Sequence, residues 1–382
     1  MPPRISLAAV PVGARVVIAM SGGVDSSVAA ALLARAGYEV VGITLQLYDH
    51  GAATGREGAC CAGRDIRDAR RVADHLGIPH YVLDFEERFR TAVIEDFAAT
   101  YARGRTPVPC VRCNERIKFR DLLRTARDLG AAALVTGHYV RRVEGREGPE
   151  LHRAADPAKD QSYFLFRTTR EQLAFCHFPL GDLRKSETRR IAAELGLPVA
   201  RKAESQDICF VPDGRHERLV TRLRPEAGKA GEIRHLDGRL LGRHRGIAGY
   251  TVGQRRGLGV AVGERLYVIA IDGGRHRILV GPRAATLSAA AVLEEVNWLG
   301  REEGSAACRI EVQHRYNTPA VPAFLERRAD GRARIRFLLP ESGVAPGQAC
   351  VFYIGSRLLG GGWIAATEGA AASAPGEVVE PV

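Results

Sequence analysis

The sequence contains no apolar run that approaches the roughly 20 residues needed to cross a membrane as a helix, and it has only two Met and two Trp among 382 residues. Residues 1–14 do not have the layout of a secretory signal peptide, because their apolar part is short and interrupted by prolines. The eight cysteines show no regular spacing, so a disulfide framework is not expected. These absences favour a cytoplasmic protein with reduced thiols that are available for chemistry.

Acidic residues are also in deficit, with 44 Asp and Glu against 55 Lys and Arg, which gives a formal net charge of +11. Such an excess of positive charge favours a polyanionic partner. The hydrophobic content of 46% and the charged content of 26% are those of an ordinary globular protein. A chain of 382 residues is long enough for two or three domains, each with its own core.

A glycine-containing loop follows an apolar run near the start of the chain. Residues 16–19 are predicted to form a buried strand, and the sequence then reads Ser-Gly-Gly-Val-Asp-Ser-Ser over residues 21–27. We expect a helix over residues 28–36, with Asp25, Ser26 and Ser27 as its caps. Two glycines that let backbone N–H groups approach a ligand, next to a helix N-terminus, favour the binding of phosphate. The loop lacks the Gly-Lys-Ser/Thr ending of a Walker A motif, and an ordinary strand-to-helix turn is the alternative interpretation.

Strands and helices alternate over the first half of the chain. Further strands are expected over residues 38–47, 81–83 and 134–136, and helices over residues 64–76, 86–102 and 117–129. This alternation predicts an α/β fold with a mostly parallel sheet, whose ligands bind at the carboxyl ends of the strands. Gly137 and His138 directly follow a strand, so they are expected at the same edge as the glycine-containing loop. A purely structural role for His138 is equally compatible with the sequence.

Cys110 and Cys113 form a C-x-x-C pair next to two prolines. Cys113 is predicted at the start of the next helix, where the helix dipole lowers the pKa of a thiol and favours the nucleophilic thiolate. The same spacing also fits a redox pair, half of a zinc site, part of an iron–sulfur site, or two thiols without function. No second pair with zinc spacing follows, and the adjacent Cys60 and Cys61 do not supply that geometry easily. Cys209 lies between polar and apolar residues, so both an exposed and a core position fit it.

Two later regions complete the pattern. Lys159–Leu165 combines charged, amide and aromatic residues, which suits contact with a nucleotide base and also fits a helix start with a solvated end. The alternation of strands and helices stops at Gly214, and short β-like runs follow. The last of these are typical of a β-barrel-like domain with Cys308 and Cys350 in its core. Residues 370–382 are rich in Ala, Pro and Glu, and we expect them to be disordered.

Taken in order, these motifs resemble those of the tRNA-specific 2-thiouridylase family, a branch of the PP-loop ATP pyrophosphatases. The matching segments cover nearly the whole chain: Ser21–Ser27, Gly104–Pro107 with Cys113-Asn114 and Ile117–Phe119, Gly137–Tyr139, Lys159–Leu165, Phe178–Gly181, Ser205–Phe210, Gly249–Gly259 and Arg315-Tyr316. The resemblance implies a Rossmann-like parallel sheet of the PP-loop type in a catalytic domain over residues 1–214. It further implies a small central domain that contacts tRNA over residues 215–285 and a C-terminal β-barrel domain over residues 286–369.

The resemblance also implies a reaction. ATP, with magnesium, adenylates the 2-carbonyl oxygen of the wobble uridine in tRNA, a persulfide on Cys209 delivers sulfur, AMP leaves and 2-thiouridine forms. Cys113 is then the second catalytic thiol, which closes a disulfide with Cys209 that must be reduced before the next turnover. A cysteine desulfurase or a sulfur-relay protein that loads Cys209 is the implied partner besides tRNA.

Binding residues carried over from the family fall into two sets. The positions that correspond to ATP contacts are Ala19, Met20, Ser21, Gly22, Gly23, Val24, Asp25, Ser26, Leu45 and Gly137. The positions that correspond to tRNA contacts are Val108, Pro109, Cys110, His138, Lys159, Asp160, Gln161, Arg315, Tyr316 and Gln348. No metal-ligating residues are carried over.

One motif departs from the family pattern. The usual Asn-Pro-Asp is replaced by Val108-Pro109-Cys110, so any role of that Asp does not carry over. Cys110, Cys113 and Cys209 would then share one site, and a 4Fe–4S cluster on these three cysteines is the alternative sulfur carrier, because some related thiolation enzymes hold such a cluster. Two further alternatives are another PP-loop adenylating enzyme, such as a synthetase that activates a carboxylate, and an RNA-binding protein with a vestigial nucleotide site.

Overall fold

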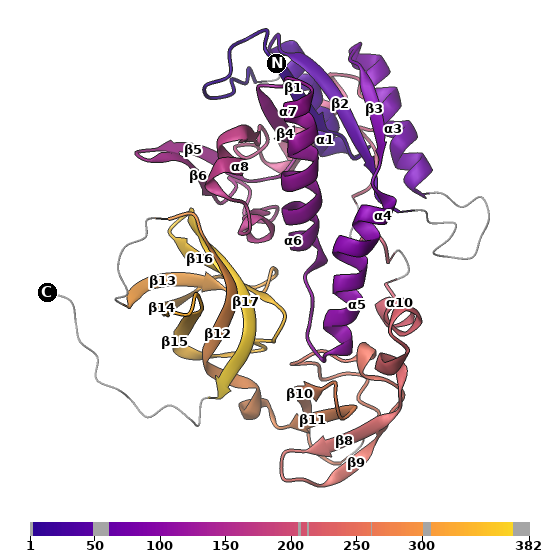
Figure 1. Ribbon diagram of the computed structural model, residues 1–382, viewed down its shortest axis with the longest axis vertical. Coiled ribbons are helices and arrows are strands. Elements are labelled where there is room, and N and C mark those ends of the chain that lie inside the picture. Colours follow the sequence, from indigo (N-terminus) through magenta and orange to yellow (C-terminus); the bar gives the residue numbers. More distant parts are fainter. Residues whose placement is uncertain are drawn as a thin grey trace, which may run out of the picture. The chain divides into compact units, whose positions relative to one another are not determined.

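The computed structural model describes residues 3–48, 61–204, 208–211, 214–260, 262–300 and 307–369. These residues fall into two compact units. The first unit comprises Met1–Glu95, Pro109–Gly214 and Gly355–Leu359, and the second comprises Asp96–Val108, Arg215–Ile354 and Gly360–Val382. Figure 1 shows a sheet with helices in the first unit and mainly strands in the second.

A five-stranded parallel sheet lies at the centre of the first unit. Its strand order is β3-β2-β1-β4-β7. The strands are β1 (Arg15–Ala19), β2 (Glu39–Gln46), β3 (His80–Asp84), β4 (Ala133–Thr136) and β7 (Cys176–His177). Val16, Val17 and Ile18 of β1 are fully buried, as expected for a central strand with neighbours on both sides. The predicted α/β fold with a Rossmann-like parallel sheet is confirmed.

Helix α1 (Val24–Arg35) packs on this sheet. It contacts α3 (Cys61–Leu76) and α9 (Lys185–Glu194). The helix begins at Val24, which is earlier than the sequence predicted. Ser26 and Ser27 lie inside its first turn and donate their hydroxyls to the carbonyl oxygen of Gly23 at 3.3 and 2.7 Å. The prediction that these side chains cap the helix is therefore wrong.

Two long helical runs contain π-helical segments, which occur frequently at functional sites. The first run is α4 (Glu86–Phe89), η1 (Arg90–Ile94) and α5 (Glu95–Ala102), and the second is α6 (Pro109–Cys113), η2 (Asn114–Leu122) and α7 (Leu123–Asp128). The second run begins at Pro109 and not at Ile117 as predicted. Proline suits a first helical position because its missing N–H would have no partner there.

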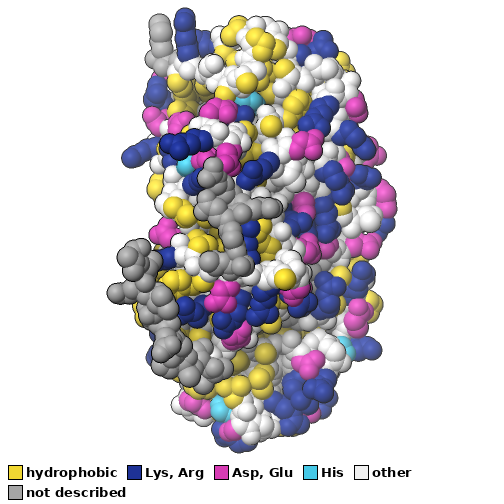
Figure 2. Space-filling view, turned by 60° about the vertical axis from the view of Figure 1, so that its left-hand side comes forward, with side chains coloured by type: hydrophobic (Ala, Val, Ile, Leu, Met, Phe, Trp, Pro, Cys, Tyr) yellow, Lys and Arg dark blue, Asp and Glu magenta, His cyan; other side chains and the backbone are white. Residues whose placement is uncertain are grey.

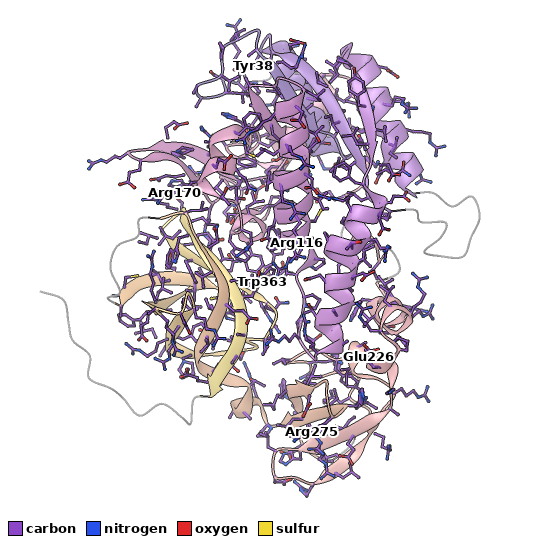
Figure 3. The ribbon with its side chains drawn as sticks, in the orientation of Figure 1. Tyr38, Arg116, Arg170, Glu226, Arg275 and Trp363 are labelled. Carbon is purple, nitrogen blue, oxygen red and sulfur yellow. The ribbon has the colours of Figure 1, made fainter. Side chains whose placement is uncertain are left out.

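The remaining elements of the first unit are short. They are the hairpin β5 (Arg141–Gly145) and β6 (Gly148–His152), the 3-10 helix η3 (Ser162–Leu165) and helix α8 (Arg170–Phe175). Thr169 and Gln172 form a capping box at the start of α8. Tyr38, labelled in Figure 3, accepts a hydrogen bond from the backbone N–H of Leu7 at 2.9 Å, which attaches the N-terminal segment to the unit.

A small sheet forms the middle of the chain, in the second unit. It follows helix α10 (His216–Leu223) and the 3-10 helix η4 (Pro225–Gly228). Its order is β10-β11-β8-β9, with β8 at Gly231–His235, β9 at Leu240–His244, β10 at Tyr267–Asp272 and β11 at Arg277–Gly281. Ile233, Val268 and Ile278 are fully buried and form its core.

A closed six-stranded barrel follows in the second unit. Its strands are β12 (Leu287–Trp298), β13 (Cys308–Gln313), β14 (Val321–Arg327), β15 (Ala333–Ser342), β16 (Ala349–Ile354) and β17 (Arg357–Gly369). They pair in the order β12-β15-β14-β13-β16-β17, and pairing of β12 with β17 closes the barrel. The predicted central domain and C-terminal barrel are thus confirmed as folds. Cys350 is buried as expected, but Cys308 is exposed because it lies at the very start of its strand.

Some sequence predictions fall on residues outside the described ranges, namely those for Cys60, for Ser205–Asp207 and for residues 370–382. Within the described ranges, no helix combines the length and the apolar character required to span a membrane.

Candidate functional site

The segment Ser21–Ser26 runs from the turn after β1 into the first turn of α1. This segment, hereafter the glycine loop, is tightly enclosed by other backbone. Gly22 has a φ of +71°, and a Cβ there would overlap the carbonyl oxygen of Asp65. A Cβ on Gly137, directly after β4, would lie 2.8 Å from the backbone nitrogen of Ser26. Only glycine therefore fits at these two positions. The residue that follows β4 lies directly against the first turn of α1. Closely approaching backbone at a helix N-terminus suits a phosphate group.

The carboxylate of Asp25, in the first turn of α1, is held by two residues distant in sequence. Lys185 Nζ donates to both carboxylate oxygens at 2.8 Å, and the hydroxyl of Tyr139 donates to Oδ1 at 2.9 Å. Lys185 and Tyr139 are buried. Burial, reinforced by the negative charge of Asp25, raises the pKa of Tyr139, so its phenol stays protonated and remains a donor. The carboxylate of the glycine loop is thus paired with a buried lysine.

The structure places the predicted ATP contacts on neighbouring strands of the first unit. Ala19–Ser26 run from the end of β1 into α1, Gly137 follows β4, and Leu45 lies near the end of β2. Because β1 pairs with both β2 and β4, these segments leave the same edge of the sheet. Sequence analysis did not single out Lys185, because no local pattern links a lysine at the start of α9 to a carboxylate so far away in the chain.

Three free cysteines of the first unit, Cys110, Cys113 and Cys209, form what is called below the thiol cluster. Cys110 and Cys209 are exposed, and Cys113 is half-buried. Cys110 and Cys113 lie close enough to Cys209 for their negative charges to raise its pKa. Phe210 is buried and packs edge-on against the ring of Phe89, with 5.7 Å between the centroids. Burial of Phe210 therefore fixes the backbone at Cys209 while the thiol stays accessible.

The surroundings of the thiol cluster disfavour thiolates. Although solvent reaches two of the thiols, enough protein surrounds them that burial raises the pKa of Cys110 and Cys113, and it raises that of Cys209 to about 12. The prediction of a lowered pKa at Cys113 is wrong. The helix begins a full turn earlier, at Pro109, so the dipole at its N-terminus acts weakly on Cys113 and desolvation outweighs it.

Lys118, on η2, is a cation that opposes this effect. Its positive charge lowers the pKa of each thiol in the cluster and of His138. Within the described ranges it forms no ion pair with an acidic side chain. Figure 3 labels Arg116 on the same helical segment, and that side chain instead donates to the carbonyl oxygen of Ala92 at 2.9 Å. Lys118 lies in the Ile117–Phe119 segment that matched the family, but nothing in the sequence indicated that its charge acts on the thiols.

His138 lies at the end of β4 among aromatic rings. Its Nδ1 is 2.7 Å from the hydroxyl of Thr136, and its ring is 6.0 Å from that of Phe119 and 6.4 Å from that of Phe178. Burial, and next the charge of Lys118, lower the pKa of His138 well below its ordinary value. His138 is therefore a neutral imidazole at physiological pH, suited to hydrogen bonding with a substrate.

Two of the predicted tRNA contacts have structural partners within the first unit. Asp160 is buried and accepts a hydrogen bond from the hydroxyl of Ser162 at 2.8 Å. Gln161 Oε1 accepts from the backbone N–H of Tyr139 at 2.9 Å. These bonds hold the turn before η3. Contact of these side chains with tRNA stays a prediction, and the structure adds a role in shaping the turn.

The carboxylate of Glu204 has three cationic neighbours. Lys159 Nζ lies 2.7 Å from Oε2, while Lys185 Nζ and Arg189 NH2 lie 3.4 and 3.3 Å from Oε1. The hydrogen bond from Lys159, and next the charge of Lys185, lower the pKa of Glu204 to about 2 against the effect of burial. Sequence analysis missed Glu204, because an acid inside a motif gives no indication of which bases it will meet.

The remaining predicted tRNA contacts are divided between the units, with Pro109 and Cys110 in the first and Val108, Arg315, Tyr316 and Gln348 in the second. Gln348 Nε2 donates to the carbonyl oxygen of Thr106 at 3.4 Å, so it lies beside the segment that leads to Val108. Arg315 NH2 donates to the carbonyl oxygen of Val252 at 3.0 Å. The second unit therefore brings Gln348 to the Val108 segment and Arg315 to the Gly249–Gly259 loop.

Positive charge is spread over the surface. Figure 2 shows Lys and Arg side chains distributed over the visible face and interspersed with Asp and Glu. In the second unit, Arg255 and Arg256 are exposed. Gln254 shapes their turn by accepting from the backbone N–H of Thr251 at 3.0 Å and donating to the carbonyl oxygen of Arg256 at 2.9 Å. The two arginines are therefore presented on an ordered loop.

In the described part of the chain, no group of three or more His, Cys, Asp or Glu side chains is arranged to hold a metal ion. The three thiols of the cluster are thus close enough to interact electrostatically without forming a ready ligand set.

Known families and proteins resemble the chain along most of its length. The family models described as tRNA methyl transferase HUP domain, tRNA methyl transferase PRC-barrel domain and Aminomethyltransferase beta-barrel domain match residues 14–213, 219–282 and 288–364. A tRNA-specific 2-thiouridylase MnmA of Parvibaculum lavamentivorans is 59% identical over 369 residues, which cover 94% of this chain and 92% of that protein. Its namesake in Rhizorhabdus wittichii is 61% identical over 358 residues, which cover 93% and 92%. Among solved structures, an NMN synthetase of Francisella tularensis aligns at 19% identity with a TM-score of 0.33, covering 56% of this chain and 78% of that one.

Proposed function

The chain belongs to the family of the tRNA-specific 2-thiouridylases, and on this premise we propose that it is an ATP-dependent tRNA-uridine 2-sulfurtransferase that converts the wobble uridine of tRNA into 2-thiouridine. The observation that carries the proposal is that one unit holds both a glycine loop suited to phosphate and a cluster of mutually interacting thiols. Activation of a carbonyl by ATP requires the first, and delivery of sulfur requires the second.

The glycine loop binds the phosphates of ATP in this proposal. Gly22 and Gly137 let the backbone of Asp65 and the end of β4 pack closely against the loop. The first turn of α1 supplies backbone N–H donors and the positive end of the helix dipole. Lys185 contributes a buried positive charge beside the loop. The 2-carbonyl oxygen of uridine attacks the α-phosphate, pyrophosphate leaves, and C2 becomes electrophilic. Asp25, the carboxylate of the loop, would hold a magnesium ion that accompanies ATP, and the ion would neutralise part of the phosphate charge.

The thiol cluster completes the reaction. The terminal sulfur of a persulfide on Cys209 attacks C2, and AMP leaves with the former carbonyl oxygen. The Cys113 thiolate then attacks Cys209 Sγ, which breaks the sulfur–sulfur bond and releases 2-thiouridine. The Cys113–Cys209 disulfide that results is reduced by an external dithiol, and a cysteine desulfurase or a sulfur-relay protein reloads Cys209.

Protonation of the thiols limits this chemistry. Burial raises the pKa of Cys113, so a thiolate must form against the ordinary preference of the site. Lys118 supplies the positive charge that favours it. The neutral ring of His138, next to the same lysine, provides a hydrogen-bonding group for the base without adding charge.

Recognition of tRNA is proposed to involve both units. The positions concerned are Val108, Pro109, Cys110, His138, Lys159, Asp160, Gln161, Arg315, Tyr316 and Gln348, with the domain over residues 215–285 adding backbone contacts. The net charge of +11 supports an electrostatic contribution to binding.

A 4Fe–4S cluster on Cys110, Cys113 and Cys209 is the alternative sulfur carrier. The persulfide is favoured because family members usually have Asp at position 110, so the reaction does not generally need a third thiol there. The described residues also include no ready set of three metal ligands. No step of the proposed reaction is therefore assigned to a cluster.

To test the proposal, pyrophosphate release is measured with and without tRNA, and the nucleosides of the tRNA are analysed by mass spectrometry. We expect pyrophosphate release that depends on tRNA, and 2-thiouridine when a persulfide donor is added. A synthetase that activates a carboxylate would release pyrophosphate without tRNA. An RNA-binding protein with a vestigial nucleotide site would bind tRNA and release none. Either outcome would replace the proposed function.

A further inference from the structure

Glu204 occupies an unusual electrostatic position in the first unit. A single carboxylate accepts from Lys159 at 2.7 Å and lies 3.4 Å from Lys185 and 3.3 Å from Arg189. Its side chain is about three-tenths exposed, at 29%. Three cations around one carboxylate repel one another, so their arrangement depends on the carboxylate that they share.

Two of these cations have a second connection. Lys185 also donates to both oxygens of Asp25 at 2.8 Å, so it lies between the carboxylate of the glycine loop and that of Glu204. Lys159 belongs to the segment that the proposed function assigns to tRNA. Glu204 therefore contacts a lysine that pairs with Asp25 of the glycine loop and a lysine of the predicted tRNA-binding segment. It also lies a few residues before Cys209 in the sequence.

The burial of Lys185 makes this connection more than a surface ion pair. Exposed pairs contribute little, because solvent competes for both partners. Lys185 is only 11% exposed in its side chain, with carboxylates on two sides. If Glu204 lost its charge, Lys185 would keep Asp25 but lose its second carboxylate neighbour. Lys159 would lose a carboxylate that now lies 2.7 Å from its Nζ.

We propose that Glu204 is a positioning residue for thiolation, which holds Lys185 beside the glycine loop and Lys159 at the tRNA-binding segment at the same time. The inference rests on the proposed function and extends it. Glu204 touches no reacting atom and acts through the two lysines. Its removal should slow the chemical step without weakening the binding of tRNA, because the substitution removes a negative charge beside Lys159 and Arg189 and keeps both cations.

The test compares E204Q with E194Q in the full-length protein. Glu194 is a suitable control because it is an exposed acid that pairs with Arg190 on the surface of α9, the same helix that carries Lys185 and Arg189. For E204Q we expect kcat for 2-thiouridine formation to fall by about 10- to 100-fold, the range expected when reacting groups are displaced slightly. The dissociation constant of tRNA should stay unchanged or decrease. The salt dependence of tRNA binding should stay unchanged. E194Q should behave as wild type in both measurements.

A second variant separates positioning from folding. E204D keeps the charge on a shorter side chain and should recover part of the lost kcat at an unchanged melting temperature. If kcat, tRNA affinity and melting temperature fell together in both variants, or if E204Q matched E194Q, Glu204 would be a structural residue and the inference would be wrong. Wild-type protein that makes no 2-thiouridine would instead overturn the proposed function, so the two failures are distinguishable.

Discussion

The glycine loop and the thiol cluster lie in the same unit but differ in how their charges are balanced. In the glycine loop, Asp25 is already paired with a buried lysine and receives a hydrogen bond from a tyrosine. In the thiol cluster, burial raises the pKa of all three cysteines, and the lysine that opposes this effect has no acidic partner in the described ranges. The negative charge of Asp25 is therefore balanced by a neighbouring lysine. The positive charge of Lys118 is not balanced by any acidic side chain in the described ranges.

This difference indicates how the two regions are used. A loop whose carboxylate is already paired can receive the nucleotide without prior rearrangement of the thiols. Lys118 has no acidic partner among the residues that the structure describes, and a thiolate, a persulfide or a phosphate would supply that counter-charge. We therefore expect the adenylation step and the sulfur-transfer step to be separable by substitution, and the predictions below test that separation.

The largest effect is expected in the thiol cluster. Cys209→Ser and Cys113→Ser should each abolish 2-thiouridine formation, because each removes a sulfur that forms or breaks a bond. A burst of pyrophosphate release that depends on tRNA should persist, since the glycine loop is intact and adenylation precedes the attack of sulfur. Cys110→Asp should retain much of the thiolation activity. An inactive Cys110→Asp protein with iron-dependent activity, measured on anaerobically purified enzyme, would favour the 4Fe–4S alternative.

A comparable effect is expected in the glycine loop. Asp25→Ala should reduce tRNA-dependent AMP formation by at least about 100-fold, because Lys185 loses its closest counter-charge and the preorganised phosphate site is disturbed. The rate at which iodoacetamide alkylates Cys113 should not change. Asp128→Ala, which removes an exposed acid at the end of α7, is the control. Unaltered AMP formation in the Asp25 variant would remove the loop from the mechanism.

A smaller effect is expected at Lys118. The lysine lowers the pKa of the thiols, so Lys118→Met should raise that pKa and move the rising limb of the pH–rate profile for sulfur transfer to higher pH. At a pH below that limb the rate should fall several-fold, because a smaller fraction of the thiol is ionised. Alkylation of Cys113 measured against pH should shift in the same direction. Lys229→Met, at an exposed lysine of the second unit, should shift neither profile.

The affinity for tRNA should depend on residues outside both regions. Log affinity is expected to fall linearly with log salt concentration, because each neutralised phosphate releases counterions. Arg255→Ala and Arg256→Ala should each weaken binding a few-fold and reduce the salt slope by about one. Cys209→Ser should leave the slope as it is. A flat salt response of the wild-type protein would show that its positive charge does not serve RNA binding.

The smallest effect concerns acid stability. The pKa of Glu204 is lowered to about 2, chiefly by the hydrogen bond from Lys159. A lowered carboxyl pKa stabilises the folded state above the unfolded-state pKa of about 4.3, and this contribution is lost as pH falls toward the folded value. The difference in unfolding free energy between wild type and Glu204→Gln should be below about 2 kcal/mol at pH 7, because solvent screens a partly exposed pair. Denaturant titrations between pH 7 and 3.5 should show the difference shrinking below about pH 4.5. A difference that stayed constant down to pH 3.5 would contradict this.

The regions differ again in how far the sequence predicted them. Local patterns decided the glycine loop, since an apolar strand, two glycines and a helix follow one another within a few residues. The parallel sheet and the barrel were also predictable from alternation and spacing. The helix starts were displaced, at Val24 and Pro109, because a chain can extend a helix into residues that sequence patterns assign to caps or loops.

What the sequence by itself determined is the set of chemical groups and the order of the elements that carry them. The tertiary structure decided which charges meet. Asp25 and Lys185 are far apart in the chain, as are Lys159 and Glu204, and no local pattern encodes such pairs. The acidity of Cys113 was decided in the same way. A sequence indicates only roughly where a helix begins. Desolvation depends on all the atoms packed around a thiol, and here that burial outweighs the dipole.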